Sequence, residues 1–163
     1  MTDNQTSFEF KTNLKKRIFA TLIDYGLFLL AFYVYVAFFG HDDDQGGQTV
    51  NGLLVLPILI YWFIYFVFVE AIYGATLAHQ GFNLKVLTLD RKEIGFEEAL
   101  KRHLLDPIEI LFYGIPAIIA IKKSDRHQRI GDMWAATFVV DMTDSEQYQE
   151  NQVVTDRKEK TYR

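Results

Sequence analysis

Three polar residues near the N-terminus fall on one face of a predicted helix. Arg17, Thr21 and Asp24 are spaced i, i+4 and i+7, and residues three or four apart are neighbours on a helix surface. In a helix that crosses a bilayer, Arg17 can reach the headgroups, whereas Asp24 lies about 10 Å further along the axis. Because a carboxylate at that depth needs a partner, the spacing indicates a site for a proton or a small cation, with Thr21 as a further oxygen ligand.

Helical side chains lean toward the helix N-terminus, so Arg17 tends to point away from Asp24, and we expect a third group, water or a bound cation to complete the site. Glu70 ends the second apolar segment and reaches a comparable depth if the two helices are antiparallel. Glu70 is then a candidate partner for Arg17, which leaves Asp24 free for a proton or cation. A second interpretation stays open, in which Arg17 and Asp24 only fix helix packing and orientation.

A second carboxylate pair and a basic stretch lie further along the chain. Asp106 and Glu109 are spaced i, i+3 beside Pro107, where a third apolar segment enters the membrane. They form either a second candidate site or simply a solvated helix end. The basic residues from 126 to 129, including Arg129, precede Asp132 and indicate contact with anionic lipid.

The composition argues against several other classes of site. The chain has no cysteine, which excludes thiol catalysis, zinc-thiolate sites and iron–sulfur clusters. It has no Gly-rich phosphate loop and no nucleophile elbow, and the acidic run at 42–44 lacks the ligand spacing of a calcium loop. Three histidines without zinc-ligand spacing are expected to be interfacial polar side chains: His79, His103 and His127. We therefore expect no enzyme activity, no bound metal and no cofactor, and the formal charge of −4 gives no reason to expect nucleic-acid binding.

The elements that must position these residues are membrane helices. Half of the 163 residues are hydrophobic and 15% are aromatic. From residue 18 to residue 39 the only residues outside the apolar set are Thr21, Asp24 and Gly26, and such a helix is about 33 Å long, enough to cross a bilayer. A second apolar run covers residues 53–69 and is interrupted only by Pro57. Both are predicted to be transmembrane helices.

The distribution of charge predicts the topology. The stretch between the two spans, residues 40–51, is acidic and has no Lys or Arg, whereas basic residues flank the other ends of both spans. The positive-inside rule therefore places the N-terminus in the cytoplasm of a multi-pass protein of the cell membrane. The third apolar run, residues 104–121, is followed by four basic residues and interrupted by prolines. These features favour a broken or re-entrant segment over a third full span.

The remaining segments carry other patterns. Residues 82–89 and 135–140 are β-branched or partly alternating and predict a small antiparallel ribbon, while 97–105 has helix-forming composition. The expected fold is an all-α membrane protein with two transmembrane helices, a third membrane segment that is broken, re-entrant or spanning, and a small cytoplasmic β-ribbon. We divide the chain into a cytoplasmic tail (1–16), a membrane domain (17–141) and a disordered cytoplasmic tail (142–163).

The ordered series of motifs resembles the RDD family of small membrane proteins, over roughly residues 14–141. The matching positions are Arg17, Asp24, Glu70 before Gly74-Ala75-Thr76, Gly81 with Leu84-Lys85-Val86, Arg102, and Arg129-Ile130-Gly131-Asp132 with Thr137-Phe138-Val139-Val140. The resemblance implies that Arg17 and Asp24 are the first two signature residues and that Asp132, or else Asp106, is the third. One departure is Ala78-His79, where the family commonly has Gly-Lys.

The resemblance also implies a function, because a few members of the family have been linked to exchange of sodium for protons or to similar cation transport. Two spans and a broken segment cannot enclose a polar path, so this interpretation requires a homo-oligomer in the lipid bilayer. The alternative is a protein without transport activity that docks a partner or anionic lipid, or assists assembly.

Overall fold

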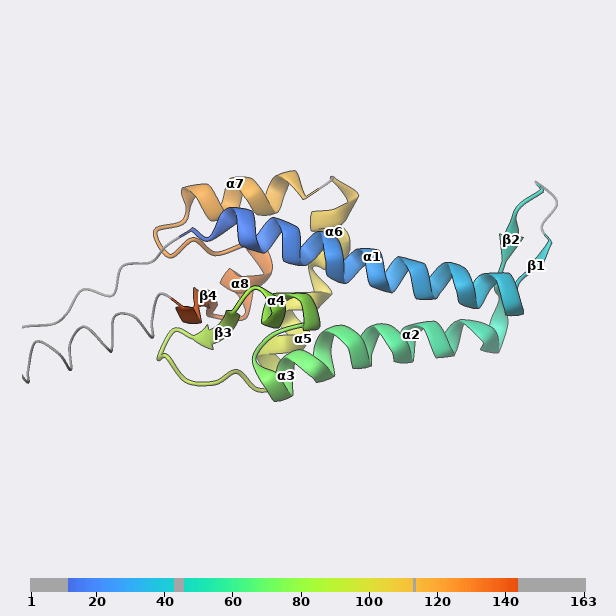
Figure 1. Cartoon of the computed structure of the whole chain (residues 1–163), viewed down its shortest axis with the longest axis horizontal. Helices are drawn as coiled ribbons and strands as arrows, with labels where there is room; N and C mark the ends of the chain where they lie inside the picture. Colours follow the sequence, from blue (N-terminus) through green and yellow to red (C-terminus); the bar gives the residue numbers. More distant parts are fainter. Residues whose placement is uncertain (1–11, 43–45, 113, 144–163) are drawn as a thin grey trace, which may run out of the picture.

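Two long antiparallel helices extend from a smaller unit of short helices and strands (Figure 1). The computed structural model describes residues 12–42, 46–112 and 114–143. The first long helix is α1 (Leu14–Phe39). The second is continuous from residue 52 to residue 73 and comprises η1 (Gly52–Val55), α2 (Leu56–Trp62), η2 (Phe63–Phe68) and α3 (Val69–Tyr73). Between them lies a short hairpin of β1 (His41–Asp42) and β2 (Gln48–Thr49).

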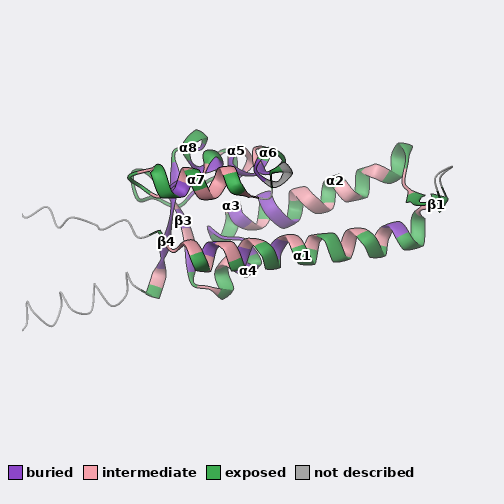
Figure 2. Ribbon diagram, turned by 90° about the horizontal axis from the view of Figure 1, so that it is seen from above, coloured by how far each residue is buried: buried purple, intermediate pink, exposed green. Residues whose placement is uncertain are grey.

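Both long helices are long and apolar enough to cross a membrane. In the most apolar 18-residue stretch of α1, only 6% of the residues are buried inside the protein, and in the corresponding stretch of the second helix 17% are buried. Large side chains such as Leu30, Tyr33 and Leu59 are exposed along these helices. Figure 2 shows the same contrast, with burial concentrated at the end that carries the short elements. The two predicted apolar helices are confirmed, and their exposed surfaces suit lipid better than water.

A π-helical stretch, η2, widens the second long helix where it approaches that end. Tyr65, Phe66 and Val67 of this stretch are buried, and Phe66 stacks on Tyr25 of α1 with ring centroids 4.7 Å apart. Such widened turns occur mostly inside α-helices and often at functional sites. Here the turn directs Tyr65 toward α1.

The smaller unit, which we call the end unit, comprises residues 74–112 and 114–143. Its elements are α4 (Leu77–Gly81), β3 (Leu84–Thr88), α5 (Phe96–Leu104), α6 (Asp106–Leu111), α7 (Ile115–Lys123), α8 (Ile130–Trp134) and β4 (Thr137–Asp141). Strands β3 and β4 pair in antiparallel fashion, with Val86 opposite Val139. The predicted ribbon and the helix predicted over 97–105 are both confirmed.

The core of the end unit is small and partly polar. A cluster of apolar side chains joins α1, the second long helix and the ribbon: Ala20, Val67, Ala78, Leu84, Val86, Ile94, Ala99 and Val139. Several of the most deeply buried side chains are charged, including Arg102, Glu70 and Asp132. Since buried charges are costly unless paired, the interior of this unit must contain a network of ion pairs.

The third apolar run does not form one long helix. It folds into α6, of six residues, and α7, of nine, and at 1.5 Å per residue neither reaches the ~30 Å needed to cross a bilayer. Helix α7 runs back beside the first turns of α1 (Figure 1), and both helices line one pocket. Gly114, with φ of 73°, caps the start of α7 in the left-handed region that favours glycine. The apolar run is therefore divided into two short helices. Most of the N-terminal and C-terminal tails (1–11 and 144–163) lies outside the described residues.

Candidate functional site

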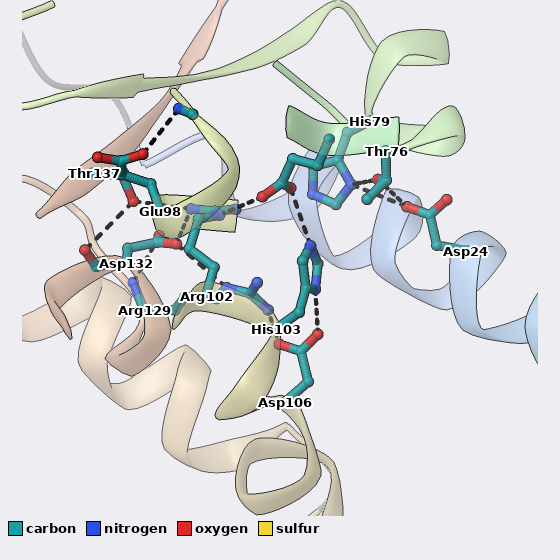
Figure 3. A network of polar contacts seen from close by, with 12 residues as sticks. Asp24, Thr76, His79, Glu98, Arg102, His103, Asp106, Arg129, Asp132 and Thr137 are labelled. Carbon is teal, nitrogen blue, oxygen red and sulfur yellow. Dashed lines mark hydrogen bonds and ion pairs between the residues drawn. The ribbon is translucent and has the colours of Figure 1, made fainter. Parts of the chain in front are cut away.

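Asp24 lies within a compact set of donors that we call the Asp24 cluster. Its Oδ1 accepts hydrogen bonds from the Tyr65 hydroxyl at 3.1 Å and from the Ala78 N–H at 3.0 Å. Its Oδ2 accepts one from the Thr76 hydroxyl at 2.5 Å and lies 3.1 Å from Nδ1 of His79. Figure 3 shows Asp24, Thr76 and His79 pointing toward one another from α1 and the start of α4. The buried carboxylate is therefore fully hydrogen-bonded, as a buried polar group must be.

His79 joins this cluster as a neutral imidazole. Burial lowers its pKa, because the loss of hydration disfavours the charged ring and outweighs the attraction of Asp24. Its Nδ1 lies 2.8 Å from the Thr76 hydroxyl and close to Asp24. With the proton on Nδ1, His79 donates to Asp24. The cluster thus brings together a carboxylate, two hydroxyls and an imidazole, all of which can hold or pass a proton.

A second and larger set of charges, which we call the arginine network, lies beside the Asp24 cluster (Figure 3). It contains three arginines, four carboxylates and one histidine: Arg17, Arg102, Arg129, Glu70, Asp106, Glu109, Asp132 and His103. Asp132 is its centre. The carboxylate of Asp132 lies 2.6 Å from Nη2 of Arg17, 3.3 Å from Nε of Arg129, and in an ion pair with Arg102.

The other arginine contacts tie Asp132 to the rest of the fold. Arg102 Nε lies 2.8 Å from Glu70 Oε1, which links α5 to the end of the second long helix. Arg17 Nη1 donates to the His127 carbonyl at 2.6 Å, which links α1 to the loop before α8. The network therefore joins segments far apart in the sequence.

Histidine and carboxylate contacts complete the network around α6. His103 lies with Nδ1 2.5 Å from Asp106 Oδ2 and with Nε2 3.3 Å from Glu70 Oε2. Asp106 also accepts from the Tyr25 hydroxyl at 2.6 Å and pairs with Arg129 at 2.7 Å. Glu109 lies further from Arg129, at 3.5 Å. Every carboxylate of the network thus lies near a cationic group.

The charges of the network balance when His103 is protonated, because three arginines and one imidazolium then face four carboxylates. Burial alone would lower the pKa of His103, but Glu70 and Asp106 outweigh burial and raise it to about 9. Burial would likewise raise the pKa of Asp132, yet the charges of Arg102, Arg17 and Arg129 lower it to about 2. Both groups are therefore charged at neutral pH.

This charge state predicts an alkaline loss of stability. A raised folded-state pKa stabilises the protein below the unfolded value of about 6.5, and that contribution disappears as pH rises through about 9. Because one pKa unit corresponds to about 1.4 kcal/mol, the loss should be on the order of 2 to 3 kcal/mol. Thermal unfolding of the purified protein from pH 7 to pH 10 measures it. The same scan of His103→Gln should be flatter, and equal slopes would contradict the assignment.

Local sequence explains how α8 presents Asp132. Asp132 Oδ2 accepts from the Arg129 backbone N–H at 3.0 Å, which caps the first turn of α8. Gly131 lets that turn approach α5 closely, since a Cβ at this position would lie 2.6 Å from the Arg102 carbonyl oxygen. Gly131 N–H in turn donates to Glu109 at 3.2 Å. A larger residue at 131 would push α8 away from Arg102.

The structure separates the residues that the sequence grouped together. Arg17 and Asp24 do not pair with each other, but the suggested pairing of Glu70 with Arg17 is wrong: Glu70 binds Arg102, and Arg17 binds Asp132. Thr21 makes no hydrogen bond to Asp24 among the described contacts and instead lines the pocket beside α7. The four oxygen and nitrogen donors to Asp24 come from the second long helix and α4 instead.

One of the two interpretations of Asp106 and Glu109 is wrong, and so is the expected lipid contact of Arg129. Asp106 and Glu109 are not a solvated helix end, because they are only 2% and 4% exposed. Arg129 does not lie on a lipid-facing basic surface, since its guanidinium pairs with Asp106 and Asp132 inside the network. Only Arg126 of that stretch is exposed.

His79 and His103 are not interfacial side chains as expected but belong to the two sets of charges, and Tyr65, Thr76 and Arg102 were not among the candidate site residues. Tyr65, Thr76 and His79 bind Asp24, and Arg102 binds both Glu70 and Asp132. One signal was present: Thr76 has the residue type of a helix N-cap before α4. His79 and Arg102 had no distinguishing spacing from the carboxylates they contact, because Asp24 lies 55 positions from His79, and Glu70 and Asp132 lie 32 and 30 positions from Arg102.

A pocket of about 150 Å³ lies between α1 and α7. Its walls are apolar, and Arg17, Arg129, Asp106 and Glu109 of the arginine network line it together with His79. The pocket thus touches both sets of charges.

Comparison with known proteins identifies one family. A model described as the RDD family matches residues 12–136. No curated protein and no solved structure matches the chain. The match covers both long helices, both sets of charges and the first strand of the ribbon, β3, and it ends directly before β4.

Proposed function

The chain belongs to the RDD family and is a membrane protein, and from this premise we propose that it exchanges a cation such as Na+ for protons, with Asp24 as the exchanging group. One observation carries the proposal. Asp24 lies inside the first span, is 1% exposed, and contacts a neutral histidine and two hydroxyl groups rather than an arginine. Its charge is thus held by groups that can release it, and intramembrane carboxylates of this kind mark proton and ion pathways.

Competition for one carboxylate links the two ions. When a proton binds Asp24, the carboxyl group is neutral and no longer needs a hydrogen bond from His79 to stabilise a negative charge. When a cation binds, the Thr76 and Tyr65 hydroxyls can rotate and offer lone pairs, since a hydroxyl both donates and accepts. Together with the carboxylate they supply the oxygen ligands that hard cations prefer. Either ion excludes the other, which is the requirement for exchange.

The proposed exchanger works as a homo-oligomer. Two long helices cannot enclose a polar path across ~30 Å of hydrocarbon. Neighbouring copies packed through their apolar helix faces would cover the path beyond the Asp24 cluster. The outer part of α1, beyond Tyr25, is apolar up to its end at Phe39, so this part of the path must come from the assembly.

We also propose an orientation with the N-terminus and the end unit in the cytoplasm. Exposed basic residues lie at the first turn of α1 (Lys15), in the last turn of α7 (Lys122 and Lys123) and just beyond it (Arg126), whereas the hairpin at the other end of the spans is acidic. The positive-inside rule places the basic end inside. Exposed apolar side chains on α6 (Ile108), on α7 (Ile115 and Ile119) and directly after α6 (Phe112) then enter the inner leaflet as a re-entrant hairpin.

Cysteine labelling tests this topology, because the chain has no native cysteine. We expect Asp42→Cys to react with an impermeant thiol reagent in right-side-out membrane vesicles. Glu93→Cys and Asp125→Cys should react only after permeabilisation, since both positions are exposed and lie on the side proposed to be cytoplasmic. Reaction of Asp125→Cys without Glu93→Cys would instead mean that the third segment crosses the membrane completely.

Ion flux in reconstituted vesicles tests the exchange itself. A Na+ gradient imposed on vesicles that contain the wild-type protein should drive proton movement in the opposite direction, at a rate well above that of protein-free vesicles. The lumen pH reports the movement. Asp42→Asn, in the exposed hairpin, should exchange like the wild type. No flux in correctly inserted wild-type protein would reject the proposal.

That negative outcome would favour a second function, for which the exposed basic residues around Lys122 and Lys123 are the observation. Such residues beside a membrane attract anionic lipid or an acidic partner. In that case the arginine network and the Asp24 cluster only hold the end unit against the spans, and a stable monomer without flux is expected.

A further inference from the structure

The pocket between α1 and α7 combines apolar walls with a charged floor. Leu14, Ile18 and Leu22 form the α1 wall, and Ala117, Ile118 and Ile121 form the α7 wall. Leu22 is 63% exposed, so the wall continues onto the surface that faces lipid. The charged side chains at the base of the pocket belong to the arginine network. A ligand with a charged head and an apolar tail matches this division.

Two guanidinium groups on the floor have unused donors. Arg17 uses Nη1 and Nη2 in its contacts, and Arg129 uses Nε and Nη1. Nε of Arg17 and Nη2 of Arg129 have no acceptor among the described residues. Since guanidinium donors recognise phosphate oxygens well, this part of the floor suits a phosphate group.

A carboxylate on the same floor is loosely held. Glu109 Oε2 lies 3.5 Å from Arg129 Nη1, whereas Asp106 lies 2.7 Å from the same nitrogen. The other oxygen of Glu109 accepts only from the Gly131 N–H, at 3.2 Å. Glu109 is 4% exposed and lines the pocket. It is therefore available to accept a hydrogen bond from an ammonium group.

We propose that this pocket binds the headgroup of an aminophospholipid such as phosphatidylethanolamine, with its phosphate on Arg17 and Arg129, its ammonium on Glu109, and an acyl chain along the apolar walls. The position of the pocket fits a lipid, because the pocket lies between α7 and the first turns of α1. The basic residues that mark the membrane surface, Lys15, Lys122 and Lys123, lie next to it. The ligand is a structural or regulatory lipid and takes part in no reaction.

Charge balance selects a zwitterion over an anion. The arginine network is neutral with His103 protonated, so a ligand without net charge leaves no uncompensated charge in the low-dielectric interior. An anionic lipid would add one. A choline headgroup has the right charge but no N–H donor for Glu109. Phosphatidylethanolamine satisfies both conditions.

Thermal unfolding of the purified full-length chain in detergent tests the assignment, because a ligand that binds only the folded state raises the melting temperature with its concentration. We expect dioctanoyl phosphatidylethanolamine to raise it more than the phosphatidylcholine and phosphatidylglycerol of equal chain length, and inorganic phosphate to have no effect. Glu109→Gln keeps an oxygen for Gly131 but loses the charge, and should weaken the response about tenfold, since one charge-assisted hydrogen bond is lost. Glu97→Gln, in an exposed pair with Lys101, is the control.

A blocked pocket provides the second test. Ala117→Phe should fill the α7 wall and abolish the response, whereas Ala37→Phe, on the exposed surface of α1, should leave it unchanged. Equal responses to the ethanolamine and glycerol lipids, a response to phosphate alone, or a full response in Ala117→Phe would each overturn the proposal. None of these measurements depends on ion exchange, so the failure of either proposal is seen independently of the other.

Discussion

Asp132→Asn is expected to lower the free energy of unfolding by about 3 to 5 kcal/mol, the usual cost of removing one partner from a buried ion pair. The substitution keeps the shape of the side chain but removes the charge that Arg17, Arg102 and Arg129 share. Three guanidinium groups would then face one another in a site where Asp132 is 0% exposed. Thermal or denaturant unfolding in detergent measures the loss.

Matched variants separate this effect from a general loss of charge. Asp125→Asn, at an exposed position, should change stability by less than about 0.5 kcal/mol. Arg17→Ala should cost clearly more than Lys15→Ala, because Arg17 is buried and paired whereas Lys15 is exposed. Equal and small effects of all four substitutions would show that the arginine network does not hold the end unit to the spans.

The elements with long, regular patterns could be predicted from the sequence. An apolar run from 18 to 39 has few alternatives to a long helix, and the β-branched stretches around 84–88 and 137–141 formed the expected ribbon. The break in the third apolar run was also visible, because Pro107, Gly114 and Pro116 interrupt it. In each case local composition indicates the type of element, although the ribbon also needs the pairing of β3 with β4.

The partners within the two sets of charges could not be predicted in the same way. The sequence marked Asp24 as an intramembrane carboxylate, but His79 reaches it across 55 positions through the turn between the second long helix and α4. From the sequence, Arg102 looks like an exposed basic residue on an amphipathic helix. It is only 2% exposed, because Gly131 lets α8 pack closely against α5. Side chains that pair across the fold carry no local signal, since only the tertiary packing brings them together.

The pairing of Arg17 shows the same limit. Helix geometry correctly turned Arg17 away from Asp24, but it offered no way to choose between Glu70 and Asp132 as the partner. Arg102 pairs with both carboxylates, so the choice follows from the tertiary packing. That packing places the carboxylate of Asp132 on α8 2.6 Å from Nη2 of Arg17.

Asp24→Asn is expected to abolish exchange of Na+ for protons while the protein still folds. The amide keeps an oxygen to accept from Ala78 N–H and Tyr65, and its NH₂ group can donate to Thr76 or His79, so the packing of α1 against α4 survives. The substituted side chain neither titrates nor carries the negative charge that attracts a cation. Exchange should therefore fall to the background of protein-free vesicles.

His79→Gln provides a graded comparison for the same site. Glutamine can still donate a hydrogen bond to Asp24 but has no titrating nitrogen. We expect exchange to continue with an altered dependence on pH, because burial of His79 and its contact with Asp24 currently set how easily the pair takes up a proton. An unchanged dependence of exchange on pH would show that His79 does not influence proton uptake by Asp24.

The most direct test is the proton flux driven by a Na+ gradient in vesicles that contain Asp24→Asn, measured beside wild-type vesicles with the same amount of correctly inserted protein. Flux that is lost in Asp24→Asn but retained in Asp42→Asn is the predicted result. Undiminished flux through Asp24→Asn would contradict the assignment of Asp24 as the exchanging group.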